Sequence, residues 1–156
     1  MINEKIRVGF IGAGQNTRKM HIPKLQALPG VELMEVANRT LGSAEKVANE
    51  FNIQRARSSW QEIVASDDVD AIVIGTWPYL HCEASCTALN SGKHVLCEAR
   101  MAKNLSEAQQ MQKTSKAHPN LISQLVPAPF TLHADKPIHT YIEQGRLGRI
   151  LYFHVD

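Results

Sequence analysis

The stretch KIRVGFIGAGQNT, residues 5–17, decides the fold that this sequence predicts. Its residues 7–11 form a short, mostly apolar run with the β-branched Val8 and Ile11, which predicts a buried strand. A glycine turn, residues 12–14, follows at once, and a polar segment then leads toward a helical pattern. Strand, glycine turn and helix in this order are what a dinucleotide-binding fingerprint requires.

The glycine turn could hold a pyrophosphate. Gly12 lets the chain turn tightly, and Gly14 has no Cβ, so a pyrophosphate could approach the backbone there. The amides of Gln15, Asn16 and Thr17 would then point at the anion, as amides do at a helix N-terminus. Thr17 stands where the fingerprint has its third glycine, so an ordinary turn between strand and helix is the alternative. The position after the first strand favours the nucleotide-binding interpretation.

Composition indicates a globular chain with no bias toward polyanions. The sequence has 156 residues, 44% of them hydrophobic, and a formal net charge of +2. This length suits one α/β domain, and the small charge gives no case for nucleic acid or an anionic membrane. The sequence shows no apolar run that would span a bilayer, no signal-peptide layout and no disulfide framework among its 3 cysteines. We therefore expect a cytoplasmic protein without a membrane or nucleic-acid partner.

Strand and helix patterns alternate along the chain, which predicts a doubly wound, mostly parallel sheet with helices on both faces. Further strands are expected at 31–37, 71–74, 93–98 and 121–126, and helices at 23–28, 41–51, from 59, at 79–91 and from 104 or 106 to 118. Pro127 and Pro129 mark a boundary. Residues 1–126 are expected to form a dinucleotide-binding domain and 127–156 the beginning of a second domain, with a helix at 135–144 and a strand at 149–155.

The residues after the second strand bear on the choice of cofactor, because a nucleotide fold reads the adenosine ribose there. NAD-selective sites usually place a carboxylate at this point, whereas this chain has Asn38 and Arg39. Asn38 cannot repel a 2′-phosphate, and Arg39 could pair with one. We expect NADP in preference to NAD. The alternative is that Arg39 stacks on adenine or is solvated.

Two later strand ends contribute further candidates, because ligands of open α/β sheets bind at carboxyl ends of strands. Thr76 and Trp77 follow the strand at 71–74, and Glu98 ends the strand at 93–98. His81 comes in the first turn of the next helix and could face the cleft, or could cap or pack. The cysteines are expected to be buried structural thiols rather than metal ligands or nucleophiles.

Together these motifs resemble the glucose–fructose oxidoreductase, inositol dehydrogenase and rhizopine-catabolism (Gfo/Idh/MocA) family. The resemblance is carried by residues 12–14, 21, 29–33, 38–39, 70–71, 76, 80–81, 88–89, 92–98 and 145–148. It implies a Rossmann domain that binds NAD(P), then an α/β domain that shapes the substrate site and commonly mediates oligomerisation. Substrates of the family are mostly sugars, polyols and their derivatives.

Three departures from the family pattern affect the chemistry. Ala99 stands where the family has a lysine that contacts substrate and supports proton transfer. Arg100 is a possible substrate contact for an anionic or hydroxylated group, but a guanidinium is a poor proton shuttle. Trp77 and Pro78 replace the usual Pro-Asn, and Trp77 could pack near the nicotinamide or in the core. The family's catalytic aspartate and histidine belong to the domain after residue 126, so no catalytic acid or base is assigned.

The expected function is that of an NAD(P)-dependent oxidoreductase acting on a sugar, polyol or derivative, represented by its cofactor-binding part. The expected cofactor-binding residues are Gly12, Ala13, Gly14, Gln15, Asn16, Asn38, Arg39, Thr76, Trp77, His81 and Glu98, and no metal site is expected. The alternatives are a non-catalytic nucleotide-binding or sensor module, and a half-enzyme that needs a partner chain. A homo-oligomer is expected, because an apolar strand at 150–153 would pair with its copy.

Overall fold

The computed structural model describes residues 5–127 and 134–152, and the chain divides into two compact units, Met1–Val126 and Pro127–Asp156. The strands of the first unit are β1 (Ile6–Ile11), β2 (Val31–Ala37), β3 (Arg55–Arg57), β4 (Ala71–Ile74), β5 (His94–Cys97) and β6 (Ser123–Leu125). Between them lie the π-helical turn η1 (Thr17–His21) and the helices α1 (Ile22–Gln26), α2 (Leu41–Phe51), α3 (Trp60–Ala65), α4 (Pro78–Asn90) and α5 (Leu105–Ala117).

The strands form one 6-stranded sheet in the order β3-β2-β1-β4-β5-β6, with every pair parallel. The chain therefore starts in the middle of the sheet, builds one side, and returns to build the other. The direction of winding reverses between β1 and β4, and this switch point is where open α/β sheets bind ligands. The predicted doubly wound Rossmann-like sheet is confirmed.

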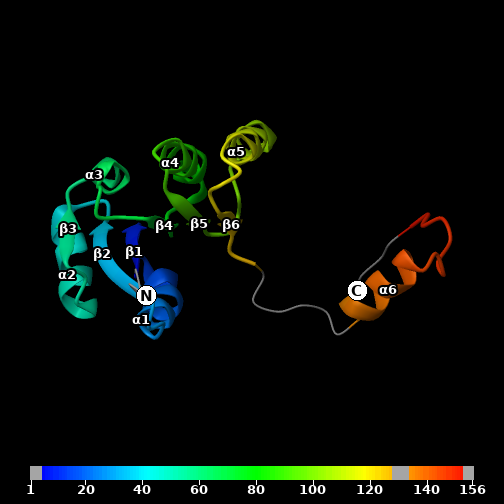
Figure 1. Cartoon of the computed structure of the whole chain (residues 1–156), viewed down its shortest axis with the longest axis horizontal. Helices are drawn as coiled ribbons and strands as arrows, with labels where there is room; N and C mark the ends of the chain where they lie inside the picture. The colour runs from blue at the N-terminus through cyan, green and yellow to red at the C-terminus, as the bar shows by residue number, and fades with distance from the viewer. Residues whose placement is uncertain (1–4, 128–133, 153–156) are drawn as a thin grey trace. The chain divides into compact units, whose positions relative to one another are not determined.

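Helices cover both faces of the sheet. Figure 1 shows α1 and α2 on one face and α3, α4 and α5 on the other. Phe10 and Val36 are buried in the cluster under α1 and α2, while Ile72 and Leu89 belong to the cluster under α3, α4 and α5. Burial of apolar area contributes about 25 cal/mol per Å², so these aliphatic runs drive the central strands into the middle layer.

One buried residue of β2 is charged and holds the edge strand β3. The Glu35 carboxylate is fully buried and accepts hydrogen bonds from Arg57 Nη2 at 2.6 Å, Ser66 Oγ at 3.0 Å and Arg55 Nε at 3.2 Å. Burial raises the pKa of Glu35, but the hydrogen bonds from Arg57 and Ser66 and the charges of both arginines outweigh it, so the pKa lies below its ordinary value. Strand β3, which the sequence analysis did not predict, depends on this cluster.

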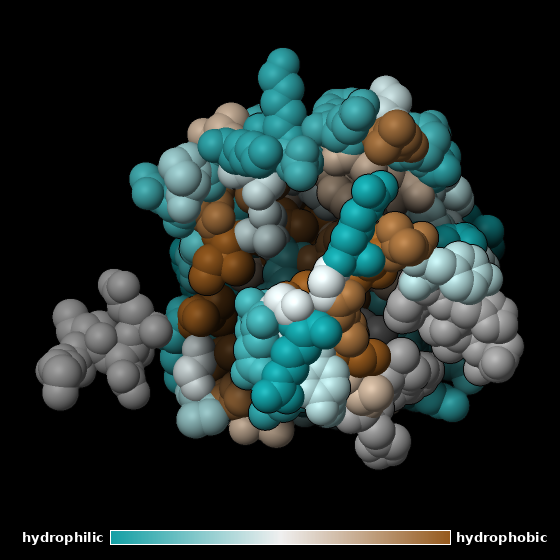
Figure 2. Space-filling view, turned by 90° about the vertical axis from the view of Figure 1, so that its right-hand side faces the viewer, coloured by the Kyte–Doolittle hydropathy of each residue, from teal (hydrophilic) through white to brown (hydrophobic). Residues whose placement is uncertain are grey.

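The face covered by α1 and α2 is open beneath β4, β5 and β6. A hollow of about 1210 Å³ there is lined by Leu25 of α1 and Leu28 after it, and by Val73 and Leu96 of the sheet. Figure 2, which looks from the β6 side, shows brown hydrophobic residues recessed between teal hydrophilic ones. In the part of the chain that the structure describes, no helix is long and apolar enough to cross a membrane.

The second unit contains α6 (Asp135–Glu143), which confirms the expected helix, followed by turns in which Gly145 and Gly148 have positive φ. Residues 149–152 are not in a strand, so the strand expected at 149–155 is wrong for them, and residues 153–155 lie outside the described residues. A strand is stable only with a partner for its backbone groups, and the described residues of this unit include no other strand. The homo-oligomer expected from pairing of this segment with a second copy stays a prediction.

Candidate functional site

The glycine turn lies at the carboxyl end of β1, beside the switch point. Gly12 has a φ of +83°, in the left-handed region that favours glycine, and a Cβ on it would lie 2.5 Å from Thr76 Cγ2. Gly14, Gln15 and Asn16 are exposed, and a Cβ on Gly14 would meet nothing within 4 Å. The turn is therefore tight at its first glycine and open at its second, as the approach of a pyrophosphate requires.

Thr17 fills the place of the fingerprint's missing third glycine. Its side chain is buried, and its hydroxyl donates to the Gly12 carbonyl oxygen at 3.2 Å. A Cβ on Gly75 would lie 2.1 Å from Thr17 Oγ1 and 2.5 Å from the Gly12 carbonyl oxygen. Gly75 thus supplies the space that lets the helical turn pass close to the end of β4, and the sequence analysis did not assign it this role.

The helix expected around Pro23 is α1, with Pro23 in its first turn, but helical backbone already begins at Gln15 and runs into α1 through η1. The amide of Arg18 donates to the Gly14 carbonyl oxygen at 3.0 Å, so the helical hydrogen bonds start within the glycine turn. The polar residues after Gly14 gave no apolar periodicity from which this turn could be recognised. The early start brings the amides of Gln15 and Asn16 to the carboxyl edge of the sheet.

Asn38 ties the glycine turn to the start of α2. Its Oδ1 accepts from the Ala13 amide at 2.7 Å, and its Nδ2 donates to the Ser43 carbonyl oxygen at 3.1 Å. Asn38 therefore positions the turn, in addition to presenting no negative charge beside it. Arg39 is exposed, and within the described residues its guanidinium has no carboxylate partner, so it is available to a ligand.

Glu98 connects the end of β5 to the turn after β1. Its Oε1 accepts hydrogen bonds from Asn16 Nδ2 and His21 Nε2, and its Oε2 accepts from the Ala99 amide at 3.2 Å. The side chains of His21 and Glu98 are only 14% and 15% exposed. The structure thus brings two expected cofactor-binding residues together and adds His21, which the sequence analysis had only as part of a family pattern.

His81 is fully buried and bridges two loops at the same edge. Its Nδ1 lies 2.8 Å from the Arg100 carbonyl oxygen, and its Nε2 lies 2.9 Å from the Thr76 carbonyl oxygen. Both ring nitrogens therefore lie within hydrogen-bonding distance of a backbone carbonyl oxygen, one in each loop. The residue is fully buried, which favours the packing alternative over a contact with the cofactor, and its ring bridges the two loops.

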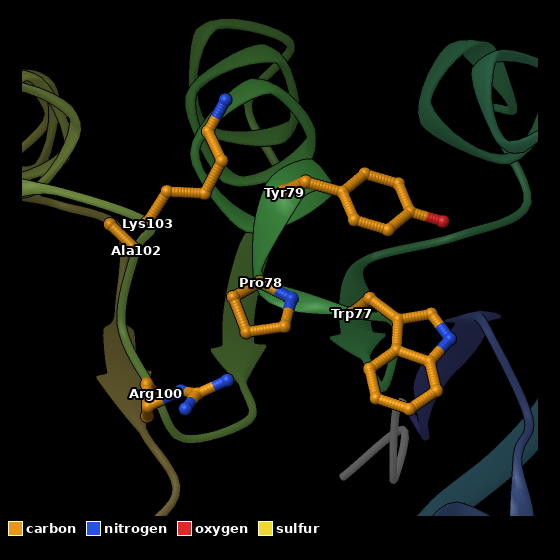
Figure 3. Close-up of a pocket in the computed structure, with 6 residues that line it drawn as sticks. All are labelled: Trp77, Pro78, Tyr79, Arg100, Ala102 and Lys103. Carbon is orange, nitrogen blue, oxygen red and sulfur yellow. The ribbon is translucent and has the colours of Figure 1, made fainter.

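Trp77 stands at the surface, with 72% of the residue exposed, so the alternative that it packs in the core is excluded. It lines a pocket of about 460 Å³ together with Pro78, Tyr79, Arg100, Ala102 and Lys103. Figure 3 shows Trp77 and Tyr79 on one side of Pro78, and Arg100 on the other. The Lys103 ammonium is bound to Glu107 Oε1 at 2.8 Å.

The cysteines are buried, as the sequence analysis expected. Burial raises the pKa of Cys82 to about 11 and that of Cys97 to about 11. These groups stay protonated at neutral pH, which makes them poor nucleophiles. Among the described residues, no group of three or more His, Cys, Asp or Glu side chains could hold a metal ion.

The sheet order, the glycine turn and the open switch point define a nucleotide-binding Rossmann domain. The chain belongs to the Gfo/Idh/MocA family, described as an oxidoreductase family with an NAD-binding Rossmann fold, whose model matches residues 6–126. The resemblance drawn from the sequence motifs is confirmed.

Individual relatives agree with this assignment. The chain is 31% identical over 111 residues to 4-carboxy-2-hydroxymuconate-6-semialdehyde dehydrogenase of Sphingobium sp., covering 71% of this chain and 35% of that protein. It is 37% identical over 152 residues to 1,5-anhydro-D-fructose reductase of Ensifer adhaerens, covering 92% of this chain and 42% of the relative. The solved 3-ketoreductase from Actinomadura kijaniata, in complex with NADP and TDP-benzene, matches with a TM-score of 0.74 and 25% identity, over 90% of this chain and 43% of that one. The chain thus spans less than half the length of these relatives.

Proposed function

We propose that this chain binds NADP, or NAD, at the carboxyl edge of its sheet and is the cofactor-binding part of an oxidoreductase acting on a sugar, polyol or derivative. The observation that carries the proposal is the open space over Gly14, set between a tight turn at Gly12 and exposed helical amides at the switch point. A side chain at Gly14 would fill the space that a pyrophosphate needs.

The residues around this opening suit the parts of the dinucleotide. Gly12, Ala13 and Gly14 would hold the pyrophosphate, with the amides of Gln15 and Asn16 directed at it. Arg39 would pair with a 2′-phosphate, and its lack of a carboxylate partner among the described residues supports the preference for NADP. Thr76 and Trp77 follow the end of β4, Glu98 follows the end of β5, and all three would border the nicotinamide half.

The cofactor, when bound, supplies hydride chemistry at the nicotinamide ring. The chain's own residues would fix the cofactor and one wall of the substrate site. The Ala99 side chain has no group that can transfer a proton, and a guanidinium such as that of Arg100 is a poor proton shuttle, so these residues contribute orientation and charge. Proton transfer would depend on residues other than Ala99 and Arg100.

The named activities of the relatives support a sugar-like substrate, since one reduces an anhydrofructose and another is a ketoreductase solved with NADP. The name of a third relative describes a substrate that has a carboxyl group. We assign residues 127–156 to the beginning of a substrate domain. We also propose that the protein is cytoplasmic and forms a homo-oligomer, for which the support is its free buried cysteines and the open apolar half of the sheet.

A second candidate is a non-catalytic nucleotide-binding or sensor module, which Ala99 favours because the family's lysine is absent. A half-enzyme completed by a separate chain would also bind cofactor. Turnover of polyols or ketosugars by the protein carrying its substrate domain would distinguish an enzyme from a sensor. Both alternatives keep the cofactor site described above.

Titration with NADPH, followed by the fluorescence of the reduced nicotinamide, tests the proposed site. Gly14→Val should weaken binding by at least tenfold, because the side chain would occupy the pyrophosphate position. Gly30→Val is the matched control, since a Cβ on Gly30 also meets nothing within 4 Å but lies in the turn before β2. Equal affinity of the Gly14 variant and the parent would place the cofactor elsewhere.

A further inference from the structure

The pocket beside Trp77 has the size and position of a substrate subsite. It lies where the loops after β4 and β5 leave the carboxyl edge of the sheet, next to Glu98 and Thr76. Its volume of about 460 Å³ falls within the range of small-molecule sites. A molecule the size of a monosaccharide would fit there beside the proposed cofactor.

The charge of this pocket is positive. Arg100 and Lys103 line it, and its lining includes no carboxylate. Glu107 pairs with the pocket's Lys103, whereas Glu98 binds His21 and Asn16, so Arg100 carries the unpaired positive charge of the lining. The Arg100 guanidinium is exposed and has no ion pair within the described residues, so a ligand can reach its paired donors.

The pocket also offers apolar ring surfaces. Trp77 and Tyr79 are 72% and 63% exposed, which is unusual for side chains whose burial is so favourable. Figure 3 shows the Arg100 guanidinium directed toward Pro78, with both aromatic rings beyond it. A ligand that places an anion on Arg100 would bring its own ring over Pro78 toward Trp77.

The two loops that carry Trp77 and Arg100 are both held by the buried side chain of His81. The His81 ring binds the backbone carbonyl oxygens of Thr76 and Arg100, one residue before Trp77 and at Arg100 itself. This fixes the backbone from which both ligand-facing side chains extend. A site whose loops are tied in this way is pre-organised, which reduces the entropy that binding must offset.

We propose that this pocket binds an anionic substrate, a sugar-sized ring bearing a carboxylate or a phosphate, with the anion on Arg100 and the ring against Trp77. The inference rests on the proposed cofactor-binding function and names the substrate class for that same site. The positive charge of Arg100 selects acidic sugars over neutral ones. Lys103 adds to the positive field, although its ammonium stays with Glu107.

Calorimetric titration of the NADPH-loaded chain with D-glucuronate, D-glucose 6-phosphate and D-glucose tests the proposal. At least one of the two anions should bind at least tenfold more tightly than glucose, as expected for a charge-assisted contact. The anion that binds more tightly shows whether the site prefers a carboxylate or a phosphate. Binding should weaken as salt rises, because an exposed charge pair is screened. Equal binding of glucose, or binding of neither anion, would overturn the proposal.

Matched variants locate the contact. Arg100→Ala should abolish the preference for the anion, Arg100→Lys should keep part of it, and Trp77→Ala should weaken all ring ligands. Lys113→Ala is the control, because it removes one exposed positive charge from α5 about two turns after the helix begins. If Lys113→Ala reduced binding as much as Arg100→Ala, the effect would be one of net charge and the site would be refuted.

The same preparations separate the two proposals. NADPH affinity is measured first, by cofactor fluorescence. NADPH binding without any anion binding would refute the subsite and leave the cofactor site intact. Absence of NADPH binding would refute the proposed function and, with it, the subsite that depends on it.

Discussion

Thr17 and Gly75 fit together where the turn after β1 passes the end of β4: a Cβ on residue 75 would lie 2.1 Å from Thr17 Oγ1. The same Cβ would lie 2.5 Å from the Gly12 carbonyl oxygen, which is backbone and cannot move away cheaply. The fingerprint's third glycine normally allows close packing of helix and strand. Here the close approach is achieved from the strand side, by Gly75, and the helix side carries a hydroxyl.

Gly75→Ala should therefore destabilise the protein by about 1–3 kcal/mol or more, the usual cost of overpacking. Urea unfolding measures the loss. Gly42→Ala provides the control, because a Cβ there meets nothing within 4 Å and alanine favours the helix α2. A Gly75 variant as stable as the parent would show that the turn relaxes more easily than this geometry implies.

The buried Glu35 should make stability depend on acid. Its pKa is lowered in the folded protein, so its contribution is present above the unfolded pKa of about 4.3 and is lost as pH falls through the folded pKa. Glu35→Gln should cost about 1–3 kcal/mol near pH 7, where Arg57 and Arg55 lose their charged partner. Urea midpoints at pH 7, 5, 4 and 3 should converge for parent and variant toward the acidic end.

Glu45→Gln is the comparison for this experiment, because Glu45 is exposed on α2. It should change the midpoint little at any of these pH values. A constant difference between parent and Glu35→Gln from pH 7 to pH 3 would contradict the linkage and point to lost packing instead.

Hydrophobic runs made most of the sheet predictable. The bounds expected for β2, α2 and β4 are those observed, because each is a continuous apolar or amphipathic run closed by a turn. Strand β3 was missed because Arg55–Arg57 is polar at both ends, and its place in the sheet comes from a distant carboxylate, Glu35. The expected strand after Arg149 was apolar in the same way, but the described residues of its unit include no partner strand.

The candidate site was predictable where one segment determines it and not where two segments meet. Gly12 and Gly14 follow from the local order of strand, turn and helix. The pairing of His21 with Glu98 joins residues 77 positions apart, so no local spacing indicates it. The burial of His81 likewise depends on a loop from the next strand, and the sequence alone left its packing role and its cleft role equally open.

Replacing His81 should loosen the loops that it bridges. His81→Leu keeps the apolar volume but removes the ring that bridges the carbonyl oxygens of Thr76 and Arg100, at a cost of about 1–3 kcal/mol for a buried acceptor left unpaired. Urea unfolding should show this loss. His118→Leu, which removes one hydrogen bond to Asn90 on the surface, should cost no more than about 1 kcal/mol. Equal losses in both variants would show that the bridge adds nothing.

Arg39 should decide the choice between NADP and NAD. Its guanidinium is exposed at the end of β2, without a carboxylate partner in the described residues, and Asn38 beside it presents no negative charge. A charge-assisted contact with the 2′-phosphate is worth roughly 1.5–3 kcal/mol, or about tenfold or more in affinity. Arg39→Ala should therefore weaken NADP binding by at least about tenfold.

NAD is the internal control for this variant, because it has no 2′-phosphate and its affinity should change little. Dissociation constants for both cofactors, measured with parent and variant at the same ionic strength, give the four values needed. The coupling between the arginine and the phosphate is the difference between the two cofactors in their response to the mutation. Lys46→Ala, which removes an exposed charge from α2, should leave the ratio of the two affinities unchanged. If the parent binds NAD more tightly than NADP, or if Arg39→Ala weakens both equally, Arg39 does not read the 2′-phosphate and instead contacts a part of the dinucleotide that both cofactors share.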